Sequence, residues 1–237
     1  QRSYNINAHV AEDADLTQVK PVRKASWRNY GALLQGVYRR RTILATVTSI
    51  ASSFAYNAVA FGLPVIISSF CAQSMLTTIL VSLALNLLFA FVGGLLAVRL
   101  VPRLGAWEMS VAGYSCQCIA LLGLALIGRP EGGEQAAMAI AMLALFLFGQ
   151  GFGPGSHTMT FASLSYPASL RGVGVGFNQT LMRGSSTVSL FLFPLLVAAF
   201  GTGVFWVIFL APLIGLLALL AIRWEPSGYD VDAEDFT

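Results

Sequence analysis

Between Thr42 and Ile222 the chain is almost free of charge, and this feature constrains its fold more than any other. The charged side chains of that interior are Arg99, Arg103, Glu108, Arg129, Glu131, Glu134, Arg171 and Arg183. Charged residues make up 11% of the whole chain and hydrophobic residues 56%, whereas soluble domains carry about 25% charged residues. Water could not solvate such a surface, so the sequence predicts an all-α membrane protein, whose helices satisfy their own backbone hydrogen bonds.

Six stretches are long and apolar enough to cross a bilayer, whose hydrocarbon core of about 30 Å needs roughly 20 residues per helix. These stretches are Ile43–Phe70, Leu76–Arg99, Glu108–Gly128, Ala136–Ser163, Gly172–Phe200 and Gly203–Arg223. The sequence therefore predicts three parts. They are a polar segment at residues 1–41, a bundle of six transmembrane helices at residues 42–223, and an acidic tail at residues 224–237.

The distribution of positive residues predicts how the bundle is oriented. They precede the first stretch and follow the second, fourth and sixth, whereas the alternate connections carry Arg129 alone. The residues concerned are Lys20, Arg23, Lys24, Arg28, Arg39, Arg40, Arg41, Arg99, Arg103, Arg171 and Arg223. Cytoplasmic loops carry an excess of Lys and Arg, so we expect a multi-pass protein of the plasma (inner) membrane, in contact with lipid, with both ends cytoplasmic. This topology accounts for the net charge of +3, which therefore gives no indication of a nucleic-acid partner.

The segment before the first stretch has two interpretations. Residues Ser26–Arg41 could form an amphipathic helix on the inner membrane surface, with Trp27 and Tyr38 at the interface, or they could be a basic flank of the first span. The chain starts at Gln1, without an initiator Met or a signal peptide. We expect this start to be a cut or processed edge.

Cysteine usage predicts neither a metal site nor a cofactor. Cys71, Cys116 and Cys118 have no cluster of histidines beside them, as a zinc or redox signature would require.

Polar side chains within the apolar stretches indicate a candidate binding site, because such residues face a bundle interior or a water-filled cavity. In the first stretch, helical spacing places Tyr56 and Asn57 on one face with Ser53, and the fourth stretch contributes Gln150. The fifth carries a stripe of small or polar residues, namely Gly172, Gly176, Gln179, Arg183 and Thr187. The candidate substrate-binding residues are therefore Arg183, Gln179, Gln150, Tyr56 and Asn57. The glycine pairs Gly149/Gly153, Gly151/Gly155 and Gly172/Gly176 have an alternative role in close helix packing.

Arg183 is the strongest of these candidates. At ~1.5 Å per residue it lies ~15 Å from a helix start near Val173, close to mid-membrane. None of the six stretches carries an acidic residue inside its apolar part. Its counter-charge is then either an anionic ligand or a group on another segment, and the sequence leaves both open.

Three motifs resemble those of the major facilitator superfamily. The stretch "GGLLAVRLVPRLGAW" resembles the loop signature G-x-L-x-D-R-x-G-R-R, with Gly94, Arg103 and Gly105 in place and Pro102 where the Asp is expected. The stretch "SLSYPASLRGVGVG" resembles the sugar-porter pattern S-E-x-F-P-x-x-x-R-G-x-G-x-G. Its matching residues include Tyr166, Pro167, Arg171 and Gly172, and Leu164 stands in place of the Glu. The ending "WEPSGYDVD" resembles a P-E-T-K-G-type ending and keeps Glu225, Pro226 and Gly228.

This resemblance implies the C-terminal six-helix half of a twelve-helix carrier, whose partner would be a further six helices upstream. It implies a secondary transporter, not an enzyme, which moves a small organic solute by alternating access with ion or proton coupling. The residues Gly94, Arg103, Gly105, Pro167, Arg171 and Gly172 would form its cytoplasmic gating motifs.

Phosphate and aromatic-acid symporters look similar around Arg183, which makes it a candidate anion contact. Ser52 stands where the phosphate symporters carry an Asp, so a proton-carrying carboxylate would have to come from the other half. A membrane sensor or assembly subunit that has kept the carrier fold is the alternative function. An intramembrane serine enzyme is disfavoured because Ser156 and His157 are adjacent and point about 100° apart on a helix.

Overall fold

The computed structural model describes residues 27–70, 74–226 and 231. They form the helices α1 (Trp27–Leu33), α2 (Gly36–Phe70), α3 (Met75–Leu85), α4 (Phe91–Leu104), α5 (Ala106–Ile127), α6 (Gly133–Phe152), α7 (Pro154–Leu164), α8 (Ala168–Phe200) and α9 (Val204–Ala221). A π-helical turn, η2 (Asn86–Ala90), joins α3 to α4, and a 3-10 turn, η3 (Gly201–Gly203), joins α8 to α9. The residues that the structure describes contain no strand, which confirms the all-helical class.

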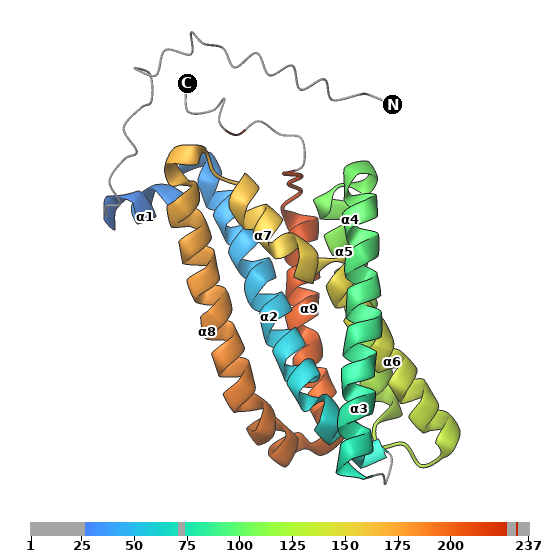
Figure 1. The fold of residues 1–237 in the computed structure, drawn as a ribbon. Helices are drawn as coiled ribbons and strands as arrows, with labels where there is room; N and C mark the ends of the chain where they lie inside the picture. Colours follow the sequence, from blue (N-terminus) through green and yellow to red (C-terminus); the bar gives the residue numbers. More distant parts are fainter. Residues whose placement is uncertain (1–26, 71–73, 227–230, 232–237) are drawn as a thin grey trace, which may run out of the picture.

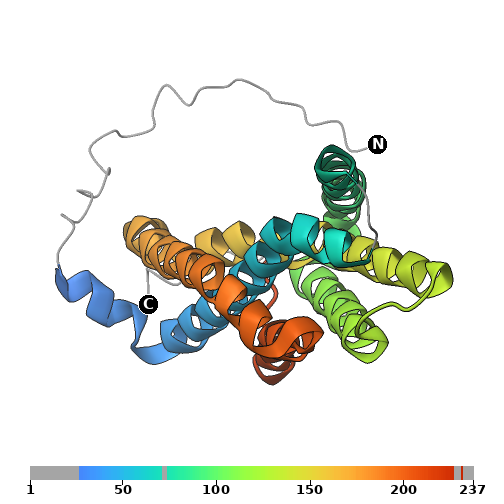
Figure 2. The ribbon, with the colours of Figure 1, turned by 90° about the horizontal axis from the view of Figure 1, so that it is seen from below.

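The long helices run side by side between the same two ends of the molecule (Figure 1). We call one of these the basic end. It holds the start of α2, the α4–α5 turn, the α7–α8 turn and the end of α9 (Figure 1). Helix α2 is central, since it contacts both α8 and α9, and α5 packs against α6 and α9. Seen from below in Figure 2, α3 and α9 lie on opposite sides of the bundle.

The core lies between α2, α5, α6, α8 and α9, with fully buried side chains such as Val59, Leu121 and Leu143. Small residues set how closely α5 and the end of α6 approach each other. A Cβ added to Gly113 of α5 would lie 2.6 Å from both the Gly149 carbonyl oxygen and the Gly153 Cα of the facing segment. Small residues at helix interfaces let backbones approach in this way. The Gly149/Gly153 pair therefore serves helix packing.

The fourth predicted stretch, Ala136–Ser163, is broken into two helices. Helix α6 ends at Phe152 and α7 begins at Pro154, with Gly153 between them at φ −113° and ψ −105°. Proline has no backbone N–H and its ring clashes with the preceding turn, so a helix cannot continue through it unperturbed. The Gly153 carbonyl accepts from the backbone N–H groups of Ser156 and His157, which starts the new helix.

The beginning of the bundle consists of two helices. Helix α1 ends at Leu33, and Gly36, at φ +55°, opens α2. Glycine adopts that left-handed conformation without the steric cost that other residues pay. The boundary expected at residue 41 thus lies inside α2, and most of the predicted polar segment and acidic tail fall outside the described residues.

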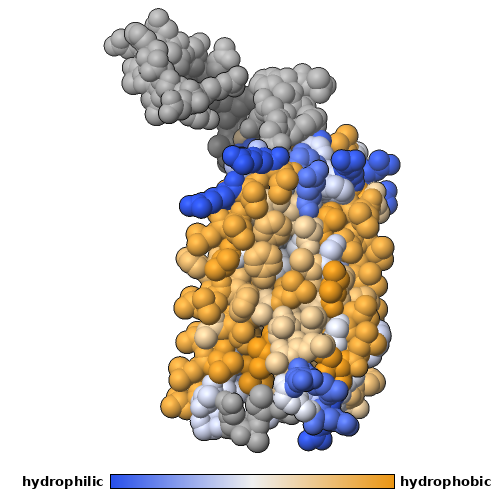
Figure 3. Space-filling view, turned by 90° about the vertical axis from the view of Figure 1, so that its right-hand side faces the viewer, coloured by the Kyte–Doolittle hydropathy of each residue, from blue (hydrophilic) through white to orange (hydrophobic). Residues whose placement is uncertain are grey.

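Five segments of the described chain are long and apolar enough to cross a membrane, one fewer than expected. They are Gly36–Ala60, Met75–Leu104, Ala106–Ile127, Gly133–Leu164 and Ala168–Ala221. The last covers α8, η3 and α9 together, because these three helical elements follow one another without a gap. Figure 3 shows the resulting apolar side of the molecule, bounded at both ends by hydrophilic residues.

Candidate functional site

A polar cavity of about 200 Å³ opens between α2, α6, α7 and α8. Its lining residues are Ser52, Ser53, Tyr56, Asn57, Gln150, Gly155, Thr158, Met182, Arg183 and Ser186. Four of the five predicted binding residues, Tyr56, Asn57, Gln150 and Arg183, therefore line one space. Its lining holds no carboxylate.

Hydrogen bonds between α2 and α8 form one wall of the cavity. The hydroxyls of Ser53 and Ser186 lie 2.5 Å apart. The amide of Asn57 donates to the Ser186 hydroxyl at 3.1 Å and to the Ser53 carbonyl at 2.7 Å. Since its amide nitrogen is held by these bonds, Asn57 has its carbonyl oxygen left as a group that a ligand could address.

The opposite wall is a chain of side chains that orients Gln150. The buried Gln117 of α5 donates through Nε2 to Gln150 Oε1 at 2.5 Å. Gln150 Nε2 in turn donates to the hydroxyl of Ser52 at 3.0 Å. Because Gln150 Oε1 accepts from Gln117 and one Nε2 N–H is donated to Ser52, the second N–H of Gln150 is the donor left for a ligand.

Tyr56 connects the cavity to the π-helical turn. Its hydroxyl donates to Asn86 Oδ1 over a long 3.4 Å, and Asn86 is the first residue of η2. Single π-helical turns inside helices are frequent at functional sites.

Arg183 is the one charged residue of the cavity lining. At ~1.5 Å per residue it lies ~22 Å along α8 from Ala168, in a helix about 50 Å long. Its side chain is exposed, and within the described part of the chain no hydrogen bond or ion pair of its guanidinium is found. The charge thus sits in the middle third of the helix, at the mouth of the cavity.

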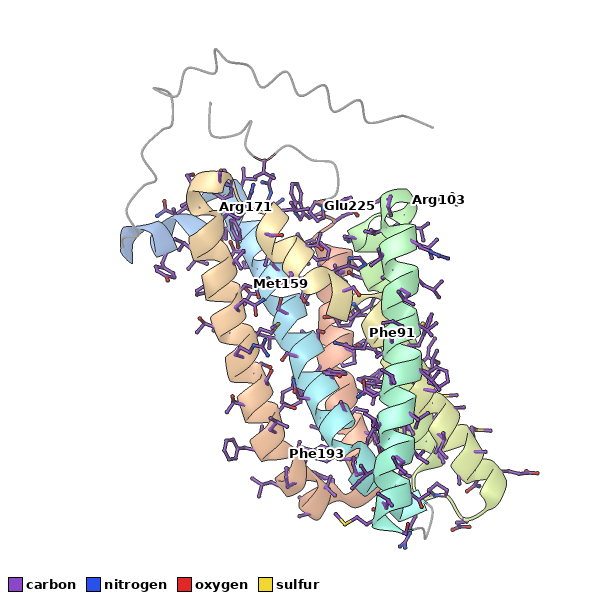
Figure 4. The ribbon with its side chains drawn as sticks, in the orientation of Figure 1. Phe91, Arg103, Met159, Arg171, Phe193 and Glu225 are labelled. Carbon is purple, nitrogen blue, oxygen red and sulfur yellow. The ribbon has the colours of Figure 1, made fainter. Side chains whose placement is uncertain are left out.

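Gln179 is not brought into this cavity. One turn nearer the start of α8, its amide instead contacts the Met159 sulfur of α7. Figure 4 labels Met159, which lies in the half of the bundle toward the basic end. The same helical stripe also carries Gly172 and Gly176, where an added Cβ would meet nothing within 4 Å. The third predicted glycine pair therefore makes no close helix contact in this bundle.

Two of the three sequence motifs, the α4–α5 loop signature and the C-terminal ending, meet at the basic end, where Figure 4 labels both Arg103 and Glu225. Gly105 ends α4 at φ +86°, and an added Cβ there would lie 2.5 Å from the Glu225 carboxylate. That carboxylate accepts from the backbone N–H groups of Ala106 at 3.1 Å and Trp107 at 2.8 Å. Glu225 therefore caps the start of α5, where the helix dipole favours a negative charge. Arg103 is exposed in the last turn of α4, and Gly94 is half-buried in the same helix.

The remaining motif fixes the α7–α8 turn. Tyr166 is 1% exposed, its ring lies where a Cβ on Gly174 would be, and its hydroxyl donates to Thr42 Oγ1 at 2.9 Å. Burial raises the pKa of the Tyr166 hydroxyl, and its hydrogen bond to Thr42 opposes that shift. Pro167 is buried at the start of α8, and Arg171 donates through Nε to the Tyr166 carbonyl at 3.3 Å. Gly172 is exposed.

Sequence reasoning missed several contributors to the cavity. Ser186 lies one turn after Met182 and Arg183, so the spacing of α8 could have included it. Gln117 is different, because it lies on α5 and reaches the cavity only through Gln150. Among the described residues there is no group of three or more His, Cys, Asp or Glu side chains placed to hold a metal ion.

Comparison with known proteins agrees with this architecture. Residues 4–223 match the family described as "Sugar (and other) transporter", which covers nearly the whole chain. No curated protein matches the sequence. The match includes the polar cavity as well as the glycine-rich and arginine-bearing turns at the basic end. The chain belongs to the sugar (and other) transporter family, and it is a membrane transporter of the major facilitator kind.

Proposed function

We propose that this chain forms the C-terminal six-helix half of a secondary active transporter that moves a small organic anion. The observation that carries the proposal is the exposed guanidinium of Arg183 in a mid-helix cavity whose lining has no carboxylate. A charge at this depth is costly unless it is paired or reaches water. An anionic solute supplies the missing counter-charge.

The other lining groups suit a solute that carries hydroxyl or carbonyl groups beside its anionic group. A guanidinium binds a carboxylate through two parallel hydrogen bonds. Gln150 offers its second amide N–H, Asn57 offers an amide acceptor, and Tyr56 and Ser52 offer hydroxyls. Because only four helices of one bundle surround the cavity, the proposed site is completed by a second six-helix bundle, against which this bundle rocks.

We place the basic end in the cytoplasm, because its turns hold nearly all the Lys and Arg of the connections between helices. Helices α8 and α9 then cross the membrane separately. A single helix over the 54 residues Ala168–Ala221 would be ~80 Å long, far more than a bilayer core of about 30 Å. Proton coupling requires a titratable side chain, and a carboxylate in that role would come from the proposed second bundle.

Uptake into proteoliposomes tests the proposal. With the full-length protein and labelled organic anions, Arg183→Gln should lower uptake at least about tenfold, since charge-assisted hydrogen bonds contribute roughly 1.5–3 kcal/mol. Arg183→Lys should retain part of the activity, because a point charge does not reproduce the guanidinium fork. Arg99→Gln, which removes an exposed arginine outside the cavity, serves as the matched control.

The outcomes separate the alternatives. Normal anion uptake by the Arg183→Gln protein would remove this residue from the binding site. If the wild-type and Arg183→Gln proteins take up neutral sugars equally well, the protein is a transporter, but the proposal that its solute is an anion is wrong. A wild-type protein that moves no solute of either class would favour a sensor or assembly subunit that has kept the carrier fold.

A further inference from the structure

A second cavity, unrelated to the solute site, lies at the basic end between the start of α2 and the end of α9. Its volume is about 850 Å³. We call it the α2–α9 groove, and it is lined by Gly36, Val37, Arg40, Arg41, Ala221, Ile222, Arg223 and Trp224. Three of the eight lining residues are arginines and none is acidic, so the groove carries a concentrated positive charge.

Aromatic rings hold two of these arginines in place. The guanidinium carbon of Arg41 lies 3.8 Å from the centre of the Trp224 ring, and that of Arg223 lies 4.9 Å from the centre of the Trp107 ring. The ring face attracts the cation held over it, and the exposed Arg223 keeps its N–H donors in the plane of its own guanidinium, where they can bind an oxyanion. Arg40 is exposed at the rim.

The backbone adds to this positive charge. Gly36 and Val37 line the groove with the first turn of the 35-residue helix α2, which contains no acidic residue. The first N–H groups of a helix have no intrahelical acceptor, and the dipole makes that end favourable for anions. The two oxygens of Glu225, the next residue after the groove, accept from the backbone N–H groups at the start of α5.

The groove also has an apolar part at membrane depth. Its apolar residues are Val37 in the first turn of α2 and Ala221 and Ile222 at the end of α9. Val37 is 62% exposed, and both helices belong to segments long and apolar enough to span the bilayer. Arginine and tryptophan at such helix ends lie at the level of lipid headgroups. The groove therefore has arginines that can bind a phosphate and an apolar part that can contact acyl chains. A phospholipid would use both parts, whereas a soluble phosphate would use only the arginines.

We propose that the α2–α9 groove binds the phosphate headgroup of an anionic phospholipid. Arg40 and Arg223 bind the phosphate together with the first turn of α2, and the charge of Arg41 adds to the attraction. Basic pockets between membrane helices bind anionic headgroups in this way. The site is independent of the solute cavity, since the two share no lining residue.

Native mass spectrometry of the full-length protein in detergent tests the proposal, with dioleoyl phosphatidylglycerol and dioleoyl phosphatidylcholine as matched probes. The wild-type protein should retain phosphatidylglycerol preferentially. The double variant R40Q/R223Q should reduce that preference by about 10- to 30-fold, the effect expected from two arginines near an anionic headgroup. The double variant R39Q/R99Q removes the same charge from exposed arginines outside the groove and should change the preference less than about twofold.

Three results would overturn the proposal. In the first, R40Q/R223Q keeps the wild-type preference. In the second, R39Q/R99Q loses it equally, which would mean a general charge effect. In the third, inorganic phosphate displaces phosphatidylglycerol as well as the lipid displaces itself, which would mean a site for a soluble anion. Melting temperatures of both variants in the same detergent show whether each is folded.

Discussion

Gln117 is a fully buried amide of α5 whose link to the solute cavity runs through Gln150. Replacing Gln117 by Met keeps the volume and removes the donor that fixes the Gln150 amide. We expect the KM for the transported solute to rise about fivefold, since a neutral hydrogen bond contributes roughly 1 kcal/mol. The turnover rate should change less than the KM, because Gln117 touches no solute. Initial uptake rates over a range of solute concentrations measure both.

The stability of the same variant distinguishes positioning from a structural role. Gln117 Oε1 is buried without a hydrogen-bond partner in the described part of the chain, so Gln117→Met also removes an unsatisfied acceptor. The melting temperature should therefore stay level or rise while the KM rises. Ser115→Ala, which removes only a bond to the Val111 carbonyl of its own helix, is the control. An unchanged KM in Gln117→Met would mean that Gln150 is oriented without Gln117.

At the scale of residues, the sequence predicts those cavity residues that lie on one face of a single helix, because the helical period places them there. Ser53 and Asn57 lie four residues apart, and in the structure both bond to Ser186. Periodicity says which side chains share a face but not which neighbouring helix that face meets. Gln179 shows this limit, because it shares the stripe of Arg183 yet meets Met159 outside the cavity.

At the scale of helices, Glu225 stabilises the start of α5 from outside that helix. Glu225→Ala removes the acceptor for the N–H groups of Ala106 and Trp107. Loss of such a cap lowers the free energy of unfolding by roughly 1–2 kcal/mol. At this chain length, each kcal/mol lowers the melting temperature by about 2–4 °C. Glu225→Gln should lose less than Glu225→Ala, since its amide oxygen still accepts. Thermal unfolding in detergent measures both.

The control for this prediction is Glu131→Ala, because Glu131 is exposed in the connection between α5 and α6, and these two helices are joined at the end of the bundle opposite the basic end (Figure 1). An equal drop for Glu131→Ala would mean that the melting temperature reports net charge and not the cap. A melting temperature for Glu225→Ala that equals the wild-type value would contradict the capping role.

Helix packing gives a second prediction at this scale. A Cβ on Gly151 of α6 would lie 2.1 Å from the Ala90 carbonyl oxygen, a contact that the backbone of η2 cannot avoid without moving. Gly151→Ala should therefore destabilise the protein by about 1–3 kcal/mol, the usual cost of overpacking. On the same helix, an added Cβ on Gly133 meets nothing within 4 Å, so Gly133→Ala should leave the melting temperature close to the wild-type value. A wild-type melting temperature for Gly151→Ala would contradict this close approach of α6 to η2.

The positions of the long helices could be predicted because apolar length is a strong signal. Their interruptions could be predicted only where a residue enforces them. The pair Gly153–Pro154 separates α6 from α7, whereas a proline alone does not mark a break, since α2, α4, α8 and α9 each contain one. The π-helical turn at Asn86–Ala90 has no such marker, since all five of its residues are compatible with an ordinary helix. The reversal between α8 and α9 depends on Gly201 at φ +55°, without any charged residue to show it.

For the whole molecule, the question that decides the topology is whether α8 and α9 are two crossings. Both helices run between the same two ends (Figure 1), and α2 contacts both of them. The start of α8 and the end of α9 therefore lie together at the basic end, whereas η3 lies at the other end. If the bundle spans the membrane as proposed, positions 168 and 223 face one side and position 202 faces the opposite side.

Single-cysteine labelling with a membrane-impermeant maleimide tests this arrangement in intact cells, after replacement of Cys71, Cys116 and Cys118. We expect Thr202→Cys and Glu131→Cys to be labelled from outside, and Ala168→Cys and Arg223→Cys only after permeabilisation. If positions 168 and 223 were labelled from opposite sides, α8 and α9 together would cross the membrane only once, which would contradict the prediction. If all four positions exchanged sides, the two crossings would stand and the basic end would face outward. The arginines of the α2–α9 groove would then meet the outer leaflet, and the lipid they bind would have to be sought there.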